Sequence, residues 1–327
     1  MAVSAGTLIR PPVTADYRSR SSLRSIGFAA GVVGILVAMV AFISSLILAN
    51  FVAGDGTETG IKTQDAWTFG VASAALVTVK VGIALILLGI VRRIWIRVQS
   101  LKEAVPRLVP QDVDKSAQVR EGSFSSPYGA GRVTAGIPET LLIHRMAYAL
   151  WAPMLLMGVM GVMIAVVLSF FWAAAASDGR AADTLTLLGL TKGTMFLGEG
   201  LVLSGIAFLL GSILGSLRQG GGEVQQSIGA GVKTLAMPLT AKLFVGLMMM
   251  GLMIEMVQFG FYIFVATLDG ATPEGAASIA AYFAWLGPLR EVGLGMILSG
   301  IVLALGTIGN ILGFQFSRIQ ELIKSGQ

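Results

Sequence analysis

The stretch SIGFAAGVVGILVAMVAFISSLILANFVAG, residues 25–54, carries no charged residue over its whole length. A bilayer core about 30 Å thick needs roughly 20 apolar residues in helical conformation, so this stretch predicts a membrane-spanning helix. A helix is expected because the open edge of a strand cannot satisfy its backbone hydrogen bonds in lipid. A transmembrane β-barrel is excluded because it would show segments of about ten residues with alternating polarity.

Five further apolar stretches of sufficient length follow along the chain. The second span contains Lys80, the fourth contains Glu199 and the fifth contains Glu255, whereas the third and sixth carry no charge. These predicted spans are residues 66–91, 146–177, 193–217, 243–268 and 292–317. One more apolar segment, residues 275–289, is too short to cross a bilayer and reaches Pro288, so we expect an interfacial or re-entrant helix there.

Composition agrees with a membrane protein and excludes several classes of function. The 327 residues are 55% hydrophobic and 13% charged, and the mean hydropathy is +0.80. Soluble domains are nearer a quarter charged, so a soluble globule and a disordered chain are both excluded. Cysteine is absent and His144 is the single histidine, which excludes disulfides, iron–sulfur clusters and Cys/His zinc sites. We therefore expect no metal, no cofactor and no catalytic activity.

The distribution of Lys and Arg predicts the orientation of the chain. Eighteen of the 23 basic residues lie in the N-terminal arm, the second and fourth connections and the C-terminal tail. Four lie in the other connections, and cytoplasmic segments carry the excess of positive charge. We therefore expect both termini to be cytoplasmic, in a bacterial inner membrane, with anionic lipids at the basic face and no nucleic-acid partner. The even-numbered spans are expected to continue as helices into the cytoplasm.

Two twelve-residue segments share a motif at an offset of 100 positions. Residues 129–140 read GAGRVTAGIPET and residues 229–240 read GAGVKTLAMPLT, and a looser copy occupies residues 7–11. The shared positions include Gly129, Gly131, Thr134 and Pro138 in one copy and Gly229, Gly231, Thr234 and Pro238 in the other. Each copy precedes an odd-numbered span. We expect the motif to form a short turn along the membrane surface, with Pro beginning a helix because it needs no N–H partner there.

An internal repeat follows from this motif and from Asp-Gly pairs that close each odd-numbered span. The sequence predicts an all-α integral membrane fold of six transmembrane helices. These form three repeated helical hairpins with pseudo-threefold symmetry, accompanied by short interfacial helices. The predicted repeats are residues 1–118, 119–222 and 223–327.

Polar residues inside the spans are candidate functional positions, because an ionisable group in a bilayer is costly. Glu255 lies near the middle of the fifth span with Gln258 one turn later, and Lys80 lies halfway through the second span. Glu255 and Lys80 can pair if they share a depth, whereas Glu199 is expected nearer the outer end, within reach of the headgroups. One interpretation is an ion or proton relay, and the other is a buried polar contact between helices or subunits.

Small residues and methionines predict how the spans pack. Gly211 and Gly215 form a GxxxG motif in the fourth span, as do Gly309 and Gly313 in the sixth. Such motifs let helices approach closely in lipid, either within one chain or against a neighbouring subunit. Methionines crowd the third and fifth spans, where flexible thioethers fill gaps or adaptable interfaces.

These features lead to two hypotheses of function. The first is a non-catalytic scaffold or assembly subunit of a larger membrane protein complex, with a trimeric partner as one option. It would pack through Gly- and Met-rich helix faces and through basic cytoplasmic segments. The alternative is a small-solute or ion transporter or channel, with protons included, that uses Glu255 and Lys80.

Overall fold

The computed structural model describes residues 22–54, 57–108, 122–126, 129–136 and 142–324. Six helices and three short strands make up this part of the chain. They are α2 (Ser22–Ala53), α3 (Glu58–Leu108), β1 (Gly122–Ser126), β2 (Gly129–Ala135), α4 (Leu142–Ser177), α5 (Ala181–Ser227), β3 (Lys233–Leu235), α6 (Leu239–Val265) and α7 (Pro273–Lys324). All six helices are long and apolar enough to span a membrane, which confirms the predicted number of spans. The chain is a multi-pass integral membrane protein.

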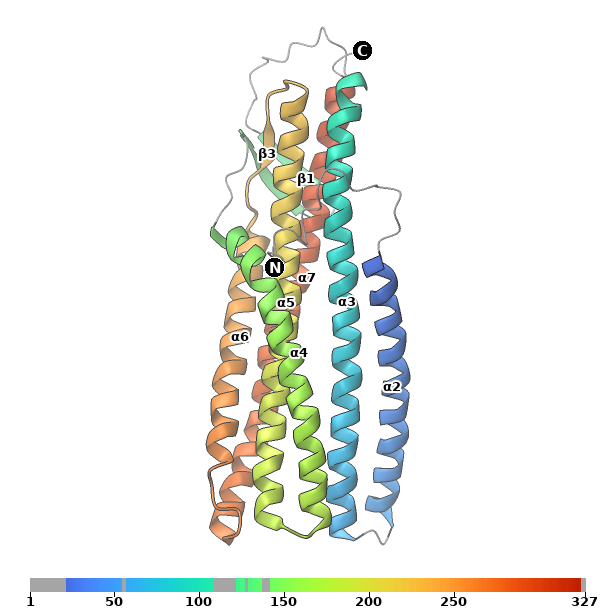
Figure 1. Ribbon diagram of the computed structural model, residues 1–327. Coiled ribbons are helices and arrows are strands. Elements are labelled where there is room, and N and C mark those ends of the chain that lie inside the picture. The colour runs from blue at the N-terminus through green and yellow to red at the C-terminus, as the bar shows by residue number, and fades with distance from the viewer. Residues whose placement is uncertain (1–21, 55–56, 109–121, 127–128, 137–141, 325–327) are drawn as a thin grey trace, which may run out of the picture.

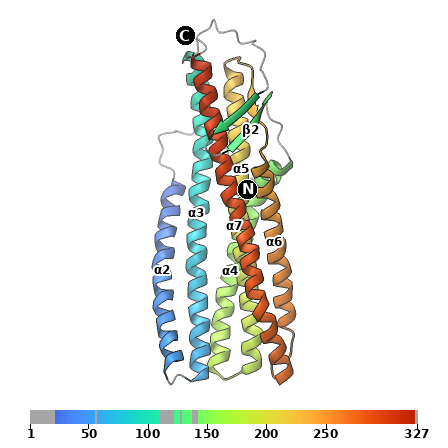
Figure 2. The ribbon, with the colours of Figure 1, turned by 180° about the vertical axis from the view of Figure 1, so that it is seen from behind.

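Helix α5 is the centre of the bundle. It packs against α3, α4, α6 and α7, and 94% of its most apolar 18-residue window is buried. Helix α2 packs mainly on α3 at one edge, and α6 lies at the opposite edge (Figures 1 and 2). Only 11% of the most apolar 18 residues of α2 are buried, so the apolar side chains of α2 face outward, as expected for contact with lipid.

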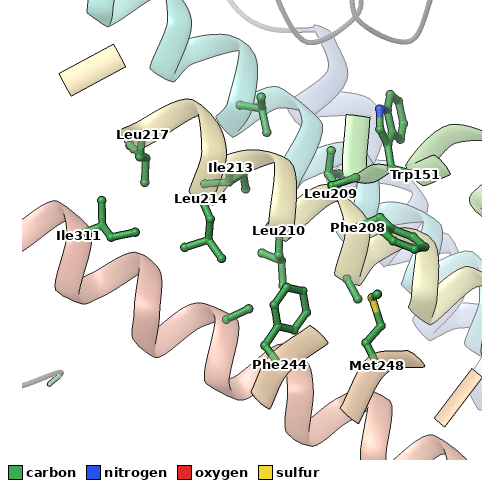
Figure 3. Close-up of a cluster of buried hydrophobic side chains, with 14 of the residues drawn as sticks. Trp151, Phe208, Leu209, Leu210, Ile213, Leu214, Leu217, Phe244, Met248 and Ile311 are labelled. Atoms are coloured by element: carbon green, nitrogen blue, oxygen red, sulfur yellow. The ribbon is translucent and has the colours of Figure 1, made fainter. Parts of the chain in front are cut away.

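Side chains of α5 form the largest buried cluster. Phe208, Leu210 and Leu214 of α5 lie beside Trp151 of α4 and Phe244 of α6 (Figure 3). Lipid tails are as apolar as these side chains, so helix association in a membrane depends on close van der Waals packing rather than on a hydrophobic driving force. The side chains of α5 therefore determine the positions of the neighbouring helices through close van der Waals packing.

The even-numbered spans are much longer than a bilayer requires. Helices α3, α5 and α7 have 51, 47 and 52 residues, against 32, 36 and 27 in α2, α4 and α6. At 1.5 Å per residue, α3 is about 77 Å long, more than twice the thickness of a bilayer core. The three long helices project together beyond the others at the end of the bundle that carries the strands (Figure 1). We call this the sheet end.

Residues 275–289 do not form a separate interfacial or re-entrant helix, so that prediction was wrong. They are the beginning of α7, which continues through Pro288. Proline removes one backbone hydrogen bond in a helix interior. Packing compensates for this loss, because Ile279 and Leu286 are buried against Tyr262 of α6.

The structure contains a three-stranded antiparallel sheet in the order β1-β2-β3. The predicted all-α fold did not include it. The shared motif contributes β2 and β3, so it forms strands where a surface turn was expected. Thr134 lies directly opposite Thr234, with Val133 opposite Leu235 and Ala135 opposite Lys233. Because the two copies differ by 100 positions, this register relates them by a local twofold axis at the threonine pair.

The contacts between hairpins centre on α5. Helix α3 packs on α2, α4 and α5, whereas α7 packs on α6, α5 and the sheet. The threefold relation of the hairpins and the proposed repeat limits therefore remain predictions from the sequence.

Candidate functional site

Four ionisable side chains from four helices lie together inside the bundle. Lys80 of α3 and Arg290 of α7 each form an ion pair with Glu199 of α5, through Oε1 and Oε2 respectively. The Glu199 side chain is only 3% exposed. Glu255 of α6 lies beside this triad, as described below. We call Lys80, Glu199, Glu255 and Arg290 the charged cluster.

The charged cluster lies level with the middle of the apolar segments. Gly198, next to Glu199, packs against Gly158 and Gly161 of α4, halfway along the candidate span His144–Ser177. A Cβ placed on Gly198 would lie 2.8 Å from the backbone nitrogen of Val162, so only glycine allows this approach. The expectation that Glu199 reaches the headgroups was wrong, because it lies 18 residues, or about 27 Å, along α5 from Ala181 and is buried.

Glu255 is fully buried, and neither carboxylate oxygen has a hydrogen-bond partner among the described residues. Two glycines make room for it. A Cβ on Gly200 of α5 would lie 2.8 Å from the Glu255 Cγ, and one on Gly293 of α7 would lie 2.6 Å from Oε1. The predicted pairing of Glu255 with Lys80 is not seen. Lys80 pairs with Glu199 instead, because α5 contacts both α3 and α6 and presents the nearer carboxylate.

Gln258 connects α6 to α7 one turn from Glu255. Its Nε2 donates a hydrogen bond of 2.7 Å to the Leu286 carbonyl, and its Oε1 is buried without a partner among the described residues. Gln258 is fully buried, and Tyr262 one turn further is 2% exposed. Polar side chains therefore continue along the buried face of α6 beyond Glu255.

Sequence reasoning missed Arg290 because it placed this residue in an outer loop after Pro288. In the structure the Arg290 guanidinium stacks on Phe196, with Cζ 4.4 Å from the ring centroid, and Nη1 donates to Glu291 at 2.7 Å. Its Nε is buried and has no hydrogen-bond partner in the part of the chain that the structure describes. Arg290 lies one turn before Gly293, which borders Glu255, so α7 carries the partner of Glu199 one turn from its contact with Glu255. The signal in the sequence was the spacing of three positions between Arg290 and Gly293, which places both residues on the same side of a helix.

The copy of the motif at residues 129–140 is partly described, and the looser copy at residues 7–11 lies outside the described residues. Gly129 begins β2 and pairs with Ser126 of β1. Gly131 allows the strand to approach β3, since a Cβ there would lie 2.7 Å from the Leu235 Cδ1. The Thr134 hydroxyl lies 3.3 Å from that of Thr234 across the strands. Pro138 lies outside the described residues.

The copy of the motif at residues 229–240 connects α5 to α6. Gly229 has φ of 69°, a left-handed conformation that favours glycine, and it turns the chain after α5. The Gly231 carbonyl accepts a 3.0 Å hydrogen bond from Arg318 of α7, and the Thr234 hydroxyl donates to the Gly136 carbonyl at 3.2 Å. Pro238 is the residue directly before α6, as expected for a proline at a helix start.

The two GxxxG motifs differ in their surroundings. Gly211 and Gly215 of α5 are buried against α4, where a Cβ would lie 3.3 Å from Ala147 and 2.9 Å from His144. Gly309 and Gly313 lie on α7 and are partly exposed. The first motif therefore packs the fourth span within this chain.

The methionines of α4 lie mainly on its outer surface. Met157, Met160 and Met163 are 55–60% exposed. No group of three or more acidic or histidine side chains that could hold a metal ion occurs among the described residues.

Comparisons with protein-family models, with curated proteins and with solved structures gave no match to this chain.

Proposed function

We propose that this protein moves protons across the membrane and that Glu255 is the residue that binds and releases them. The observation that carries the proposal is a fully buried carboxylate, level with the middle of the apolar segments, whose two oxygens lack hydrogen-bond partners among the described residues. An ionised carboxylate in such a place is very unfavourable unless it has a partner. Ionisable residues of this kind within a membrane mark proton and ion pathways.

The neighbouring residues support exchange between two protonation states. With Glu255 protonated, Arg290 and Lys80 both pair with Glu199, as the structure has them. When Glu255 releases its proton, the Arg290 guanidinium can turn toward the new carboxylate while Lys80 keeps Glu199 neutralised. The cluster then holds two positive and two negative charges. Arg290 therefore lowers the cost of the ionised state without leaving Glu199 unpaired.

Proton flux into liposomes tests the proposal. Purified protein is reconstituted in vesicles that contain a pH-sensitive dye, and a potassium gradient with valinomycin drives proton entry. We expect flux with the wild-type chain and loss of at least nine-tenths of it in Glu255→Gln, with partial recovery in Glu255→Asp. The matched control is Glu274→Gln, which removes an exposed carboxylate at the start of α7 and should conduct normally.

Equal flux in wild-type and Glu255→Gln vesicles, or no flux above empty vesicles in the wild type, would refute the proposal. Size-exclusion chromatography of each variant shows whether a lost signal reflects lost transport or a misfolded chain.

A non-catalytic scaffold subunit of a larger membrane complex is the second candidate. It is favoured by the projection of α3, α5 and α7 beyond the apolar segments at the sheet end, which we expect to be cytoplasmic (Figure 2). The projecting parts of α3, α5 and α7 would offer a surface on which partner subunits could bind. Purification from native membranes in mild detergent distinguishes the candidates, because a scaffold would migrate with partners in fixed stoichiometry, whereas a transporter would conduct alone.

A further inference from the structure

An apolar groove opens between α3, α5 and α7 where these helices leave their apolar segments. Its cavity volume is about 330 Å³. Most of the lining residues are aliphatic or aromatic, and they include Ile94 and Val98 of α3, Leu217 and Val224 of α5, and Leu312 and Phe316 of α7. Phe316 is 66% exposed, so the groove presents a large apolar side chain at its rim.

Two arginines of α3 also line the groove. Arg93 and Arg97 are exposed and are spaced one helical turn apart, and their guanidinium groups form no hydrogen bond or ion pair with the described residues. Other basic residues nearby are already paired, because Lys102 binds Glu223 and Arg318 binds Glu321 at 2.8 Å. Arg93 and Arg97 therefore leave a positive charge of two beside an apolar surface.

The position of these arginines along α3 matches the lipid headgroups. The uncharged run of α3 after Lys80 ends at Val91, and Arg93 and Arg97 follow it by about 3 and 9 Å. The headgroup layer on each side of a bilayer is about 5–8 Å thick, so Arg93 lies within this layer and Arg97 lies at its outer edge. Arginine guanidinium groups bind phosphate oxygens through paired N–H donors, which makes them well suited to a phosphodiester at this level.

We propose that the groove binds one anionic phospholipid, with its phosphate on Arg93 and Arg97 and an acyl chain that passes Leu312 and Ile90 toward the apolar segments. The proposal is independent of proton movement. The two arginines at the groove favour a lipid with a phosphate headgroup over an apolar helix from a partner protein. The value of about 330 Å³ lies within the range of small-molecule sites.

Quenching by brominated lipids tests the site. The chain has no cysteine, so Ser317→Cys gives a single labelling position beside Phe316 at the rim of the groove. The fluorophore-labelled protein in detergent is titrated with brominated phosphatidylglycerol or with brominated phosphatidylcholine. We expect phosphatidylglycerol to quench at a concentration at least tenfold lower than phosphatidylcholine.

Two double variants locate the headgroup. Arg93→Gln with Arg97→Gln should remove the preference for phosphatidylglycerol, leaving the two titrations within twofold of each other. Arg145→Gln with Lys242→Gln is the matched control, because it removes two exposed basic residues of α4 and α6 that do not line the groove. The control should keep the full preference.

Equal quenching by the two lipids in the wild type would overturn the proposal, as would an unchanged preference in the arginine variant. A label shielded from both lipids by a co-purifying polypeptide would also overturn it, and would assign the groove to a partner protein.

Discussion

Replacing Glu199 by Gln should destabilise the bundle more than removing either of its cationic partners. Glu199 accepts from both Lys80 and Arg290, and its side chain is 3% exposed. The substitution leaves two positive charges in an apolar interior opposite a neutral amide. Removing one partner of a buried ion pair costs about 3–5 kcal/mol, because the remaining charge is left without compensation.

Lys80→Met provides the comparison. It removes one cation but leaves Glu199 paired with Arg290, so the loss is about that of one charged hydrogen bond, roughly 1.5–3 kcal/mol. The double variant, Lys80→Met with Glu199→Gln, should cost less than the sum of the two single changes, since only Arg290 is then left unpaired.

Equilibrium unfolding with increasing SDS mole fraction in mixed micelles, followed by tryptophan fluorescence, measures these differences. We expect the order wild type, Lys80→Met, Glu199→Gln from most to least stable. Glu274→Gln, an exposed carboxylate on α7, should lie within about 0.5 kcal/mol of the wild type. If Glu199→Gln unfolds with the wild type, or Lys80→Met is the less stable variant, then Glu199 does not hold the cluster together.

Two further predictions concern glycines and use the same unfolding measurement. Gly158→Ala should cost about 1–3 kcal/mol, because the new Cβ would lie 2.5 Å from the Val202 backbone nitrogen and force α4 away from α5, whereas Gly246→Ala meets nothing within 4 Å and should be neutral or slightly stabilising. Equal effects of these two changes would contradict close packing of α4 on α5. Gly229→Ala should cost about 1–2 kcal/mol, because alanine is strained at φ of 69°, and an unchanged midpoint would show that the turn after α5 adapts.

The membrane-spanning helices could be predicted because apolar length is a local property of the sequence. Residues 25–54 have no charge, and the helix found there, α2, runs from Ser22 to Ala53. The even-numbered spans were also expected to extend past the apolar segments, and α3, α5 and α7 do so. Pro238 was expected at a helix start and directly precedes α6.

The contacts between helices could not be predicted, because they depend on which helix lies between which. The sequence suggested Glu255 and Lys80 as partners by depth alone, but depth does not show that α5 separates them with Glu199. Arg290 was missed because Pro288 was interpreted as the end of an apolar segment. A proline does not always end a helix, and here α7 continues through Pro288, where Leu286 is fully buried.

The strands were missed for a similar reason. The shared motif is rich in glycine and has no long run of alternating polarity, so it resembles a turn. Its strands form because two distant copies meet, with Thr134 opposite Thr234, and neither copy alone shows this pairing.

The reciprocal pairing of β2 and β3 has a mechanical consequence for the hairpins that follow them. These strands lie in the segments that lead into α4 and α6, so the second and third hairpins are fastened to each other at their entrances. Any tilt or rotation of one hairpin against the other must shear the backbone hydrogen bonds between the threonines. The strands thus oppose relative movement of the second and third hairpins at the Thr134–Thr234 pair.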